Sequence, residues 1–463
     1  AKTYDGTTSL ASSQVTLTGV TVDGVTETLT YSGSPVSSNQ NVITSGKYVS
    51  GIAALANAID GSGGKASNYI LPSQTVASLN NTVAISAATA SLNAEKVYDG
   101  SLGLTSAQLR ITGVTVDGVQ QTLGYVGIPV VSDANVATAN KYVRGLTGLL
   151  DATDSSGGFA SNYVLPTQTS AGTNNQASIT RATLTLTGTR RYDGTTSFAG
   201  TNLIAEGVNG ESFALTGLGD PSNLLSKNVQ TNSSLNSVTG LSIGASTGIN
   251  VGIASNYGDL STVGSNVSVT RAVAVLSASK TYDGSTSLTS GQIALTGVTV
   301  GGVTETLSYT GTPLLSDANV VSTKYVRGVT NVSDATDGSG GLASNYVLPD
   351  LTSASASNVA TVLPATATVS ATKMYDGTLG LNASQLTIVG VTVDGNQQIL
   401  GYTGTPTLAY KNVVTPENYV NVSTMALANG GLDVTAGVAS NYALPANTYS
   451  ASRNYAVVTK API

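Results

Sequence analysis

The sequence predicts an all-β protein of five tandem small β-sandwich modules, immunoglobulin-like and roughly 90 residues each, that form an elongated rod. Two tripeptides recur in step along the chain, and apolar and polar residues alternate on both sides of short Asp-Gly turns. Sustained helical periodicity is hard to find. β-Grasp-like modules are the alternative architecture.

The repeat is defined by Tyr-Asp-Gly and by Ser-Asn-Tyr, which follows it by about 65 residues. The tyrosines of the first tripeptide are Tyr4, Tyr98, Tyr192, Tyr282 and Tyr375. Those of the second tripeptide are Tyr69, Tyr163, Tyr257, Tyr346 and Tyr442. The module boundaries that follow are 1–87, 88–181, 182–271, 272–364 and 365–463.

Each module except the third is predicted to contain one conspicuous β-hairpin. In the first module, residues 14–31 alternate between apolar and polar side chains around Asp23-Gly24. Asp117-Gly118 and Asp394-Gly395 repeat this turn, and Gly301-Gly302 replaces it in the fourth module, where glycine also accepts positive φ. The third module is divergent, and residues 206–215 stand in place of the hairpin sequence.

The first and last modules differ from the inner ones. Modules two to five begin with a Thr- or Ala-rich strand, such as residues 182–187, that the first module lacks. At the other end, residues 455–463 resemble residues 267–273, which lead into another module. The opening residues have no signal-peptide pattern. We therefore expect a mature or excised segment of a longer array, or a subunit whose last strand completes the first module of another subunit.

Composition excludes several kinds of chemistry. The chain has no His and no Cys, which removes Ser/His and Cys/His nucleophiles, His or Cys metal sites and disulfides. Charged residues are only 10%, and the formal net charge is −6, so nucleic acid is not an expected partner. Apolar runs are too short for a membrane span.

Both tripeptides are interpreted as internal structural signatures. We expect each Tyr to bury its ring in its own sandwich, each Asp to cap a turn and each Gly to supply a left-handed conformation. The Asn-Tyr pair is expected to satisfy buried backbone groups at another corner, as in a tyrosine corner. The signature residues are Tyr4, Asp5, Gly6, Asn68, Tyr69, Tyr98, Asp99, Gly100, Asn162, Tyr163, Tyr192, Asp193, Gly194, Asn256, Tyr257, Tyr282, Asp283, Gly284, Asn345, Tyr346, Tyr375, Asp376, Gly377, Asn441 and Tyr442.

Reactive or metal-binding roles are secondary interpretations. Catalysis by the Asp is disfavoured because no second carboxylate recurs at a fixed spacing. A Lys precedes four of the Tyr-Asp-Gly tyrosines by two residues, which leaves open an isopeptide bond from Lys2 to Asn68 and at equivalent pairs. No cofactor is expected, although loop calcium stays open, and ordinary Asx turns are the favoured interpretation. The aspartates in question are Asp23, Asp60, Asp117, Asp154, Asp337 and Asp394.

The order of motifs resembles a known repeat class. Lys-x-Tyr-Asp-Gly-Thr-Thr-Ser is followed by an Asn-Val element, as in Lys227-Asn228-Val229 and Lys411-Asn412-Val413, and then by Ala-Ser-Asn-Tyr-x-Leu-Pro. This combination resembles the YDG and MBG repeat modules of large, filamentous-haemagglutinin-like bacterial surface adhesins. The resemblance implies secretion, display on the bacterial cell surface and a role in cell adhesion.

The function that we expect is therefore a non-enzymatic stalk or fibre of an extracellular adhesin or surface filament. Its expected partners are further copies of the same module in the full-length chain or filament. One alternative is carbohydrate binding to surface glycans, for which Tyr48, Tyr142 and Tyr325 are the candidate ligand contacts, because Trp is absent. Another is a subunit that polymerises by strand exchange between its ends.

Overall fold

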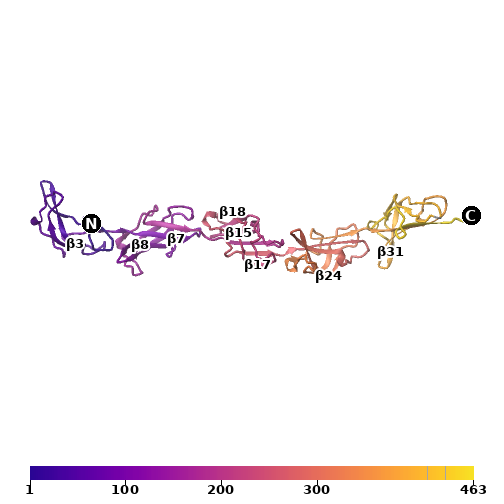
Figure 1. Cartoon of the computed structure of the whole chain (residues 1–463), viewed down its shortest axis with the longest axis horizontal. Helices are drawn as coiled ribbons and strands as arrows, with labels where there is room; N and C mark the ends of the chain where they lie inside the picture. The colour runs from indigo at the N-terminus through magenta and orange to yellow at the C-terminus, as the bar shows by residue number, and fades with distance from the viewer. Residues whose placement is uncertain (414, 433) are drawn as a thin grey trace. The chain divides into compact units, whose positions relative to one another are not determined.

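The computed structural model describes residues 1–413, 415–432 and 434–463. Its regular elements are β-strands and three-residue 3₁₀ helices, and none of the described residues lies in an α-helix (Figure 1). The predicted all-β class is confirmed.

The residue contacts group the chain into two compact units. The first unit comprises 1–186, 204–216 and 242–261, and the second comprises 187–203, 217–241 and 262–463. The sequence repeats are called the first to fifth repeat below, with the boundaries given above. The division runs through the third repeat, so the first two joins between repeats lie in the first unit and the last two in the second.

The second repeat illustrates the strand arrangement. Its strands are β6 (Ala88–Thr89), β7 (Ser91–Val97), β8 (Leu109–Val116), β9 (Val119–Thr122), β10 (Gly124–Val131), β11 (Val143–Leu150), β12 (Tyr163–Val164) and β13 (Asn175–Thr180). One sheet has the order β13-β7-β8-β9, in which β7 pairs antiparallel with β8 and parallel with β13. Strands β10 and β11 pair with each other, as do β6 and β12.

The core of this repeat lies on one face of β7 and β8. Alternation along β7 turns Leu92, Ala94 and Lys96 inward and leaves Val97 exposed, because side chains in a strand point to opposite faces in turn. Leu109 and Ile111 of β8 are buried with them.

The fourth and fifth repeats follow the same arrangement in the second unit. The fourth has β20 (Ala272–Val273), β21 (Val275–Thr281), β22 (Ile293–Val300), β23 (Val303–Thr306), β24 (Ser308–Leu315), β25 (Val326–Ser333), β26 (Tyr346–Val347) and β27 (Asn358–Leu363). The fifth has β28 (Ala365–Thr366), β29 (Thr368–Met374), β30 (Leu386–Val393), β31 (Asn396–Ile399), β32 (Gly401–Gly404), β33 (Thr407–Leu408), β34 (Val420–Asn421), β35 (Met425–Ala428), β36 (Tyr442–Ala443) and β37 (Asn454–Thr459).

The first repeat has fewer strand residues at its start. Its strands are β1 (Lys2–Thr3), β2 (Leu17–Val22), β3 (Val25–Ser37), β4 (Val49–Ala56) and β5 (Ile85–Ser86). Strand β1 pairs in parallel with β5 over these two residues. In the second repeat, the corresponding pairing of β7 with β13 extends from Leu92 to Val97.

The third repeat contributes strands to both units. In the first unit, residues 204–206 of β15 (Leu203–Glu206) pair with β16 (Ser212–Thr216), which pairs with β18 (Ser242–Ser246). In the second unit, β19 (Asn266–Thr270) pairs with β14 (Thr185–Arg191) and with β17 (Gln230–Ser233).

Short 3₁₀ helices mark two recurrent places in the repeat. Five of them end on the Asn of Ser-Asn-Tyr: η2 (Ala66–Asn68), η3 (Ala160–Asn162), η5 (Ala254–Asn256), η7 (Ala343–Asn345) and η9 (Ala439–Asn441). The others precede a hairpin: η1 (Ser12–Gln14), η4 (Gly200–Asn202), η6 (Ser290–Gln292) and η8 (Ala383–Gln385). The chain therefore enters the Ser-Asn-Tyr tyrosine from a tight turn in every repeat.

The hairpin turns have the backbone that their residues predict. Asp117 and Gly118 both have positive φ, of 49° and 82°, as a two-residue turn between twisted strands requires. The Gly301-Gly302 turn of the fourth repeat also has positive φ at both residues. The divergent third repeat still forms a hairpin, β15–β16, in which Asn209 and Gly210 supply the positive φ values. The altered sequence therefore keeps two residues that accept positive φ at this turn, although its flanking residues do not show the hairpin pattern of the other repeats.

The alternation along β7 leads to a stability prediction. Leu92→Ala should destabilise the second repeat by about 2–5 kcal/mol, because Leu92 is fully buried and its removal leaves a cavity. Val97→Ala, on the exposed face of the same strand, should cost less than about 0.5 kcal/mol. Calorimetric unfolding should show a component at lower temperature for the first variant alone; equal effects of the two variants would contradict the assigned core.

Candidate functional site: joints between successive repeats

The Tyr-Asp-Gly tripeptide forms a tight turn held by a buried lysine. In the first repeat, Asp5 Oδ1 accepts a hydrogen bond from Thr7 N at 2.9 Å, and Gly6 has a φ of 76°. Lys2 Nζ lies 2.7 Å from Asp5 Oδ1 and donates to the carbonyl oxygens of Thr7 and Ser9. In this turn, the Asp side chain bonds to the backbone two residues on, and the Gly has a left-handed conformation.

Electrostatics favours the charged form of this Asp. Partial burial alone would raise the pKa of Asp5, but hydrogen bonds from Lys2 and Thr7 outweigh it and hold the pKa below its usual value. Lys96, Lys280 and Lys373 make the same ion pair in their repeats, and Arg190 replaces them in the third. These lysines bind the turn and not Asn68 or its equivalents, which is against the isopeptide interpretation.

The tyrosine of this turn packs against the following repeat, which corrects our expectation that it is buried within its own. The Tyr4 hydroxyl donates to Gln121 Oε1 at 3.1 Å, and its ring meets Tyr163 edge to face with centroids 5.4 Å apart. Gly6 permits this approach, because a Cβ there would lie 2.1 Å from Val116 Cγ2 of the second repeat. The ring is buried, but the surface that buries it belongs to its neighbour.

The same contact recurs at three further joins. We call the contact between one repeat and the next a joint, and number the joints in chain order. The tyrosine hydroxyl distances are 2.6 Å for Tyr98 to Glu211, 2.8 Å for Tyr192 to Glu305 and 3.2 Å for Tyr282 to Gln398. The edge-to-face ring pairs are Tyr98 with Tyr257, Tyr192 with Tyr346 and Tyr282 with Tyr442.

The tyrosine of Ser-Asn-Tyr completes this arrangement from the other side. The Tyr163 hydroxyl donates to the same Gln121 Oε1 and accepts a hydrogen bond from Val114 N at 2.9 Å. Gly113 is required here, because a Cβ would lie 2.2 Å from that hydroxyl oxygen. Gln121 Nε2 donates to Gly157 O, which fixes the orientation of the amide. One side-chain oxygen therefore accepts hydrogen bonds from the tyrosines of two repeats.

The asparagine of Ser-Asn-Tyr binds the preceding repeat. Asn162 Oδ1 accepts from Val42 N at 2.9 Å, and its Nδ2 donates to Asn41 Oδ1 at 2.9 Å. Lys47 Nζ donates to Val42 O and so stabilises the loop that contains Val42. The Asn side chain therefore accepts from a backbone N–H, and that backbone group lies in the neighbouring repeat. The equivalent pairs are Asn256 with Val136, Asn345 with Val229 and Asn441 with Val320.

The acceptor between the tyrosines is an amide at two joints and a carboxylate at the other two. Burial raises the pKa of Tyr98 to about 12, and the hydrogen bond to Glu211 adds to this effect. Burial alone would raise the pKa of Glu305, but hydrogen bonds from Tyr346, Tyr192 and Lys227 lower it below its usual value. Lys227 Nζ lies 3.0 Å from Glu305 Oε1, which adds an ion pair to the third joint.

Sequence reasoning missed these acceptors. Four of the five stand in a strand, 23 residues after the Tyr-Asp-Gly tyrosine of their repeat, and Glu211 stands 19 residues after Tyr192, directly before β16. That recurrent offset is the signal that could have identified them. The acceptor residues are Glu27, Gln121, Glu211, Glu305 and Gln398.

The other candidate residues lie apart from the joints. Tyr48, Tyr142 and Tyr325 are half-buried, and each directly follows a buried lysine of the loop described above. Asp60, Asp154 and Asp337 accept from a Ser backbone N–H two residues on, as predicted for Asx turns. Asp23, Asp117 and Asp394 lie at hairpin turns with positive φ. Within the described part of the chain, no three acidic side chains gather as a metal site would require.

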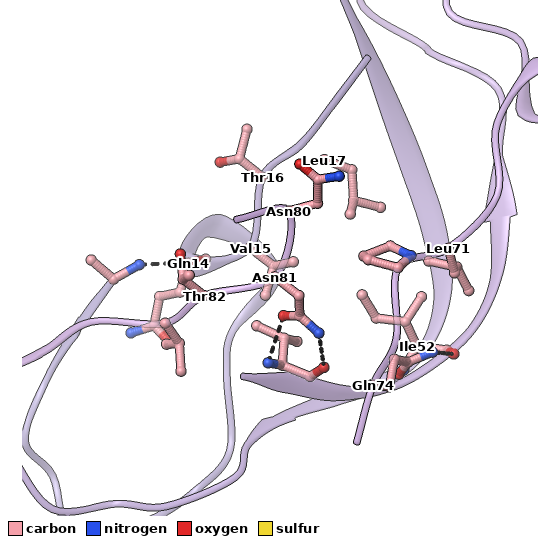
Figure 2. A pocket seen from close by; sticks show the side chains of 14 residues that line it. Gln14, Val15, Thr16, Leu17, Ile52, Leu71, Gln74, Asn80, Asn81 and Thr82 are labelled. Atoms are coloured by element: carbon pink, nitrogen blue, oxygen red, sulfur yellow. Dashed lines mark hydrogen bonds between the residues drawn. The ribbon is translucent and has the colours of Figure 1, made fainter. Parts of the chain in front are cut away.

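The first repeat has a pocket beside its short strand β1. Its lining includes 14–17 and 80–83, and Asn81 accepts from Val49 N and donates to Val49 O. Figure 2 shows Asn81 together with the apolar side chains of Leu17, Ile52 and Leu71. In the second repeat, the corresponding segments 108–111 and 174–177 flank β7. The pocket of the first repeat therefore corresponds in position to the core-facing side chains of β7 in the second repeat.

Comparison with known proteins gave no relatives: no family model, curated protein or solved structure matches the chain. In the part of the chain that the structure describes, no helix has the length and apolar character needed to cross a bilayer.

The joint asparagine leads to a prediction with a control in the same chain. Asn162→Ala should weaken the first joint by about 1–3 kcal/mol, because it leaves the Val42 amide without its buried acceptor. Asn68→Ala removes the same residue type where it is exposed, and should leave that amide unchanged. Hydrogen exchange at Val42 measures both variants. Unchanged protection in Asn162→Ala would contradict the assigned contact.

The carboxylate of the third joint leads to a pH prediction. The pKa of Glu305 is lower in the folded chain than its ordinary 4.5, so its contribution is present above about pH 4.5 and is lost as pH falls through the folded pKa. Protection of the Val229 amide should therefore fall on acidification, and Glu305→Gln should abolish this dependence. Because the fourth joint uses Gln398, the Val320 amide is the internal reference. Parallel pH dependence at Val229 and Val320 would contradict this role of Glu305.

Proposed function

We propose that the chain is a non-enzymatic stalk or fibre region of an extracellular bacterial adhesin or surface filament. It is built from five β-sandwich modules of roughly 90 residues that are held in series. The single observation that carries this proposal is that one contact recurs at four successive joints. In each, the tyrosine hydroxyl of one repeat donates to a Glu or Gln of the next repeat. A chain in which the same contact connects each repeat to the next is suited to hold the repeats in a defined arrangement and to carry tension along its length.

The side chains that a catalytic interpretation would use are already engaged. The Tyr4 and Tyr163 hydroxyls share one acceptor, and burial raises the pKa of Tyr163 to about 12, which disfavours proton transfer at neutral pH. Asp5 is engaged by Lys2 and by Thr7 of its own turn. The signature residues therefore support a structural role, and the resemblance to adhesin repeats supports the extracellular location.

Scattering and imaging of dilute protein test the proposal. Small-angle X-ray scattering should give an extended particle whose longest dimension is on the order of 150 Å or more, since five domains of this size are placed in series. The double variant Asn162→Ala/Asn441→Ala should increase bending at two joints, and negative-stain images should show more kinked particles. Asn68→Ala is the matched control.

Two outcomes would refute the proposal. One is a compact particle in dilute solution. The other is saturable glycan binding that is lost in Tyr48→Ala, Tyr142→Ala and Tyr325→Ala variants while the fold is retained, which would make carbohydrate recognition the function.

A further inference from the structure

The first repeat carries one half of a joint on its exposed surface. The Tyr69 hydroxyl donates to Glu27 Oε2 at 2.6 Å and accepts from Val20 N at 3.0 Å, so its tyrosine and acceptor are arranged as at the four formed joints. Asn68 is exposed, whereas the asparagines of the other repeats are fully buried by the preceding repeat. This surface, Glu27, Asn68 and Tyr69, is called the acceptor half.

The fifth repeat carries the other half. Its Tyr-Asp-Gly turn is formed, because Lys373 Nζ lies 2.9 Å from Asp376 Oδ1 and donates to Gly380 O. The Tyr375 ring is 39% exposed, whereas the equivalent tyrosines of the four formed joints are 2–6% exposed. Lys411 and Asn412 are also exposed. They lie in the loop whose counterpart at each formed joint donates a backbone N–H to the asparagine of the next repeat. Tyr375 with 411–413 is called the donor half.

The two halves match the third joint residue by residue. There, Tyr192 and Lys227 both contact Glu305, and Val229 N donates to Asn345. The donor half has the same order of residue types, Tyr375 followed by Lys411-Asn412-Val413, and the acceptor half has the same Glu, Asn and Tyr. The Val25–Leu29 segment is identical in sequence to Val303–Leu307. Opposite charges at Lys411 and Glu27 therefore fit each other as Lys227 and Glu305 do.

The end of the chain adds a backbone contact to this match. In the fourth repeat, Ala272 and Val273 pair in parallel with Tyr346 and Val347, and Ala274 N donates to Val347 O. Lys460–Ile463 follows β37 as Arg271–Ala274 follows β19. Ile70 is 93% exposed, compared with 37% for its counterpart Val347, so this edge of the first repeat is accessible to an incoming strand.

The pocket of the first repeat lies next along that path. Leu71 and Pro72, which directly follow Ile70, belong to its lining (Figure 2). Ile463 corresponds to Ala274, the residue that precedes the core strand β21 in the fourth repeat. An apolar residue at this point would lie close to Leu71, which lines the pocket.

We propose that the fifth repeat of one copy binds the first repeat of a second copy, and that this contact reproduces the third joint between molecules. The inference rests on the joints that carry the proposed function. The two halves are different surfaces, so the contact is head to tail.

Two exposed substitutions test this contact. Wild-type mass, measured by light scattering and sedimentation from micromolar to millimolar concentration, should rise with concentration. Asn68→Ala removes the acceptor half and Tyr375→Ala removes the donor half, so each variant alone should stay at the monomer mass. Tyr449→Ala is the matched control, because Tyr449 has the same exposed fraction as Tyr375 and lies outside the donor half.

Mixing the two variants identifies the geometry. The Asn68→Ala copy keeps its donor half and the Tyr375→Ala copy keeps its acceptor half, so an equimolar mixture should form dimers and nothing larger. Monomeric wild type over the whole range, a mixture that stays monomeric, or an equal loss in Tyr449→Ala would overturn the proposal. Scattering of single dilute copies tests the proposed function separately, so the two can fail independently.

Discussion

The structure depends on one shared acceptor side chain at each joint. This Glu or Gln accepts hydrogen bonds from two tyrosines that belong to successive repeats. A Gln uses its single amide oxygen, and a Glu uses its two carboxylate oxygens. A buried acceptor left unpaired is costly, so each tyrosine stabilises the placement of the other. At the first joint, Gln121 connects Tyr4 to Tyr163, and the edge-to-face ring contact packs around this polar centre. The joint is therefore polar in its centre and aromatic around it.

Glycine makes this close packing feasible. Gly113 lies directly over the Tyr163 hydroxyl, and Gly6 lies against Val116 of the next repeat. A side chain at either position would push the backbone away from the side chain that it contacts, the Tyr163 ring at Gly113 and Val116 at Gly6. The glycine-rich composition, which by itself also fits a disordered segment, here reflects close approach of strands and turns.

Local features of the fold could be predicted from the sequence because their causes are local. The Asp117-Gly118 turn has positive φ at both residues, and the Asx turn at Asp5 is formed by a residue two positions away. The all-β class follows from the same local alternation. The divergent third repeat shows the limit, since its hairpin persists with Asn209-Gly210 although the flanking strand sequence has changed.

The joints could not be predicted in the same way. Asn68 and Asn162 occupy identical tripeptides, yet one is exposed and the other fully buried, because burial depends on whether another repeat contacts them. The partner of Asn162 is the backbone amide of Val42, 120 residues away, and a backbone group has no sequence signature. The sequence also assigns each tyrosine to its own repeat, whereas Tyr4 is buried by the next repeat and Tyr375, which has no such contact in this structure, is exposed.

The interchange of Glu and Gln at the joints has a genetic consequence. Because Tyr4 bonds to Gln121 and Tyr192 bonds to Glu305, the tyrosine contact accepts either side chain. Unequal recombination that inserts or deletes one whole repeat would bring together surfaces that carry the same kinds of tyrosine, asparagine and acceptor. Such an event would change the length of the array without requiring a new type of contact.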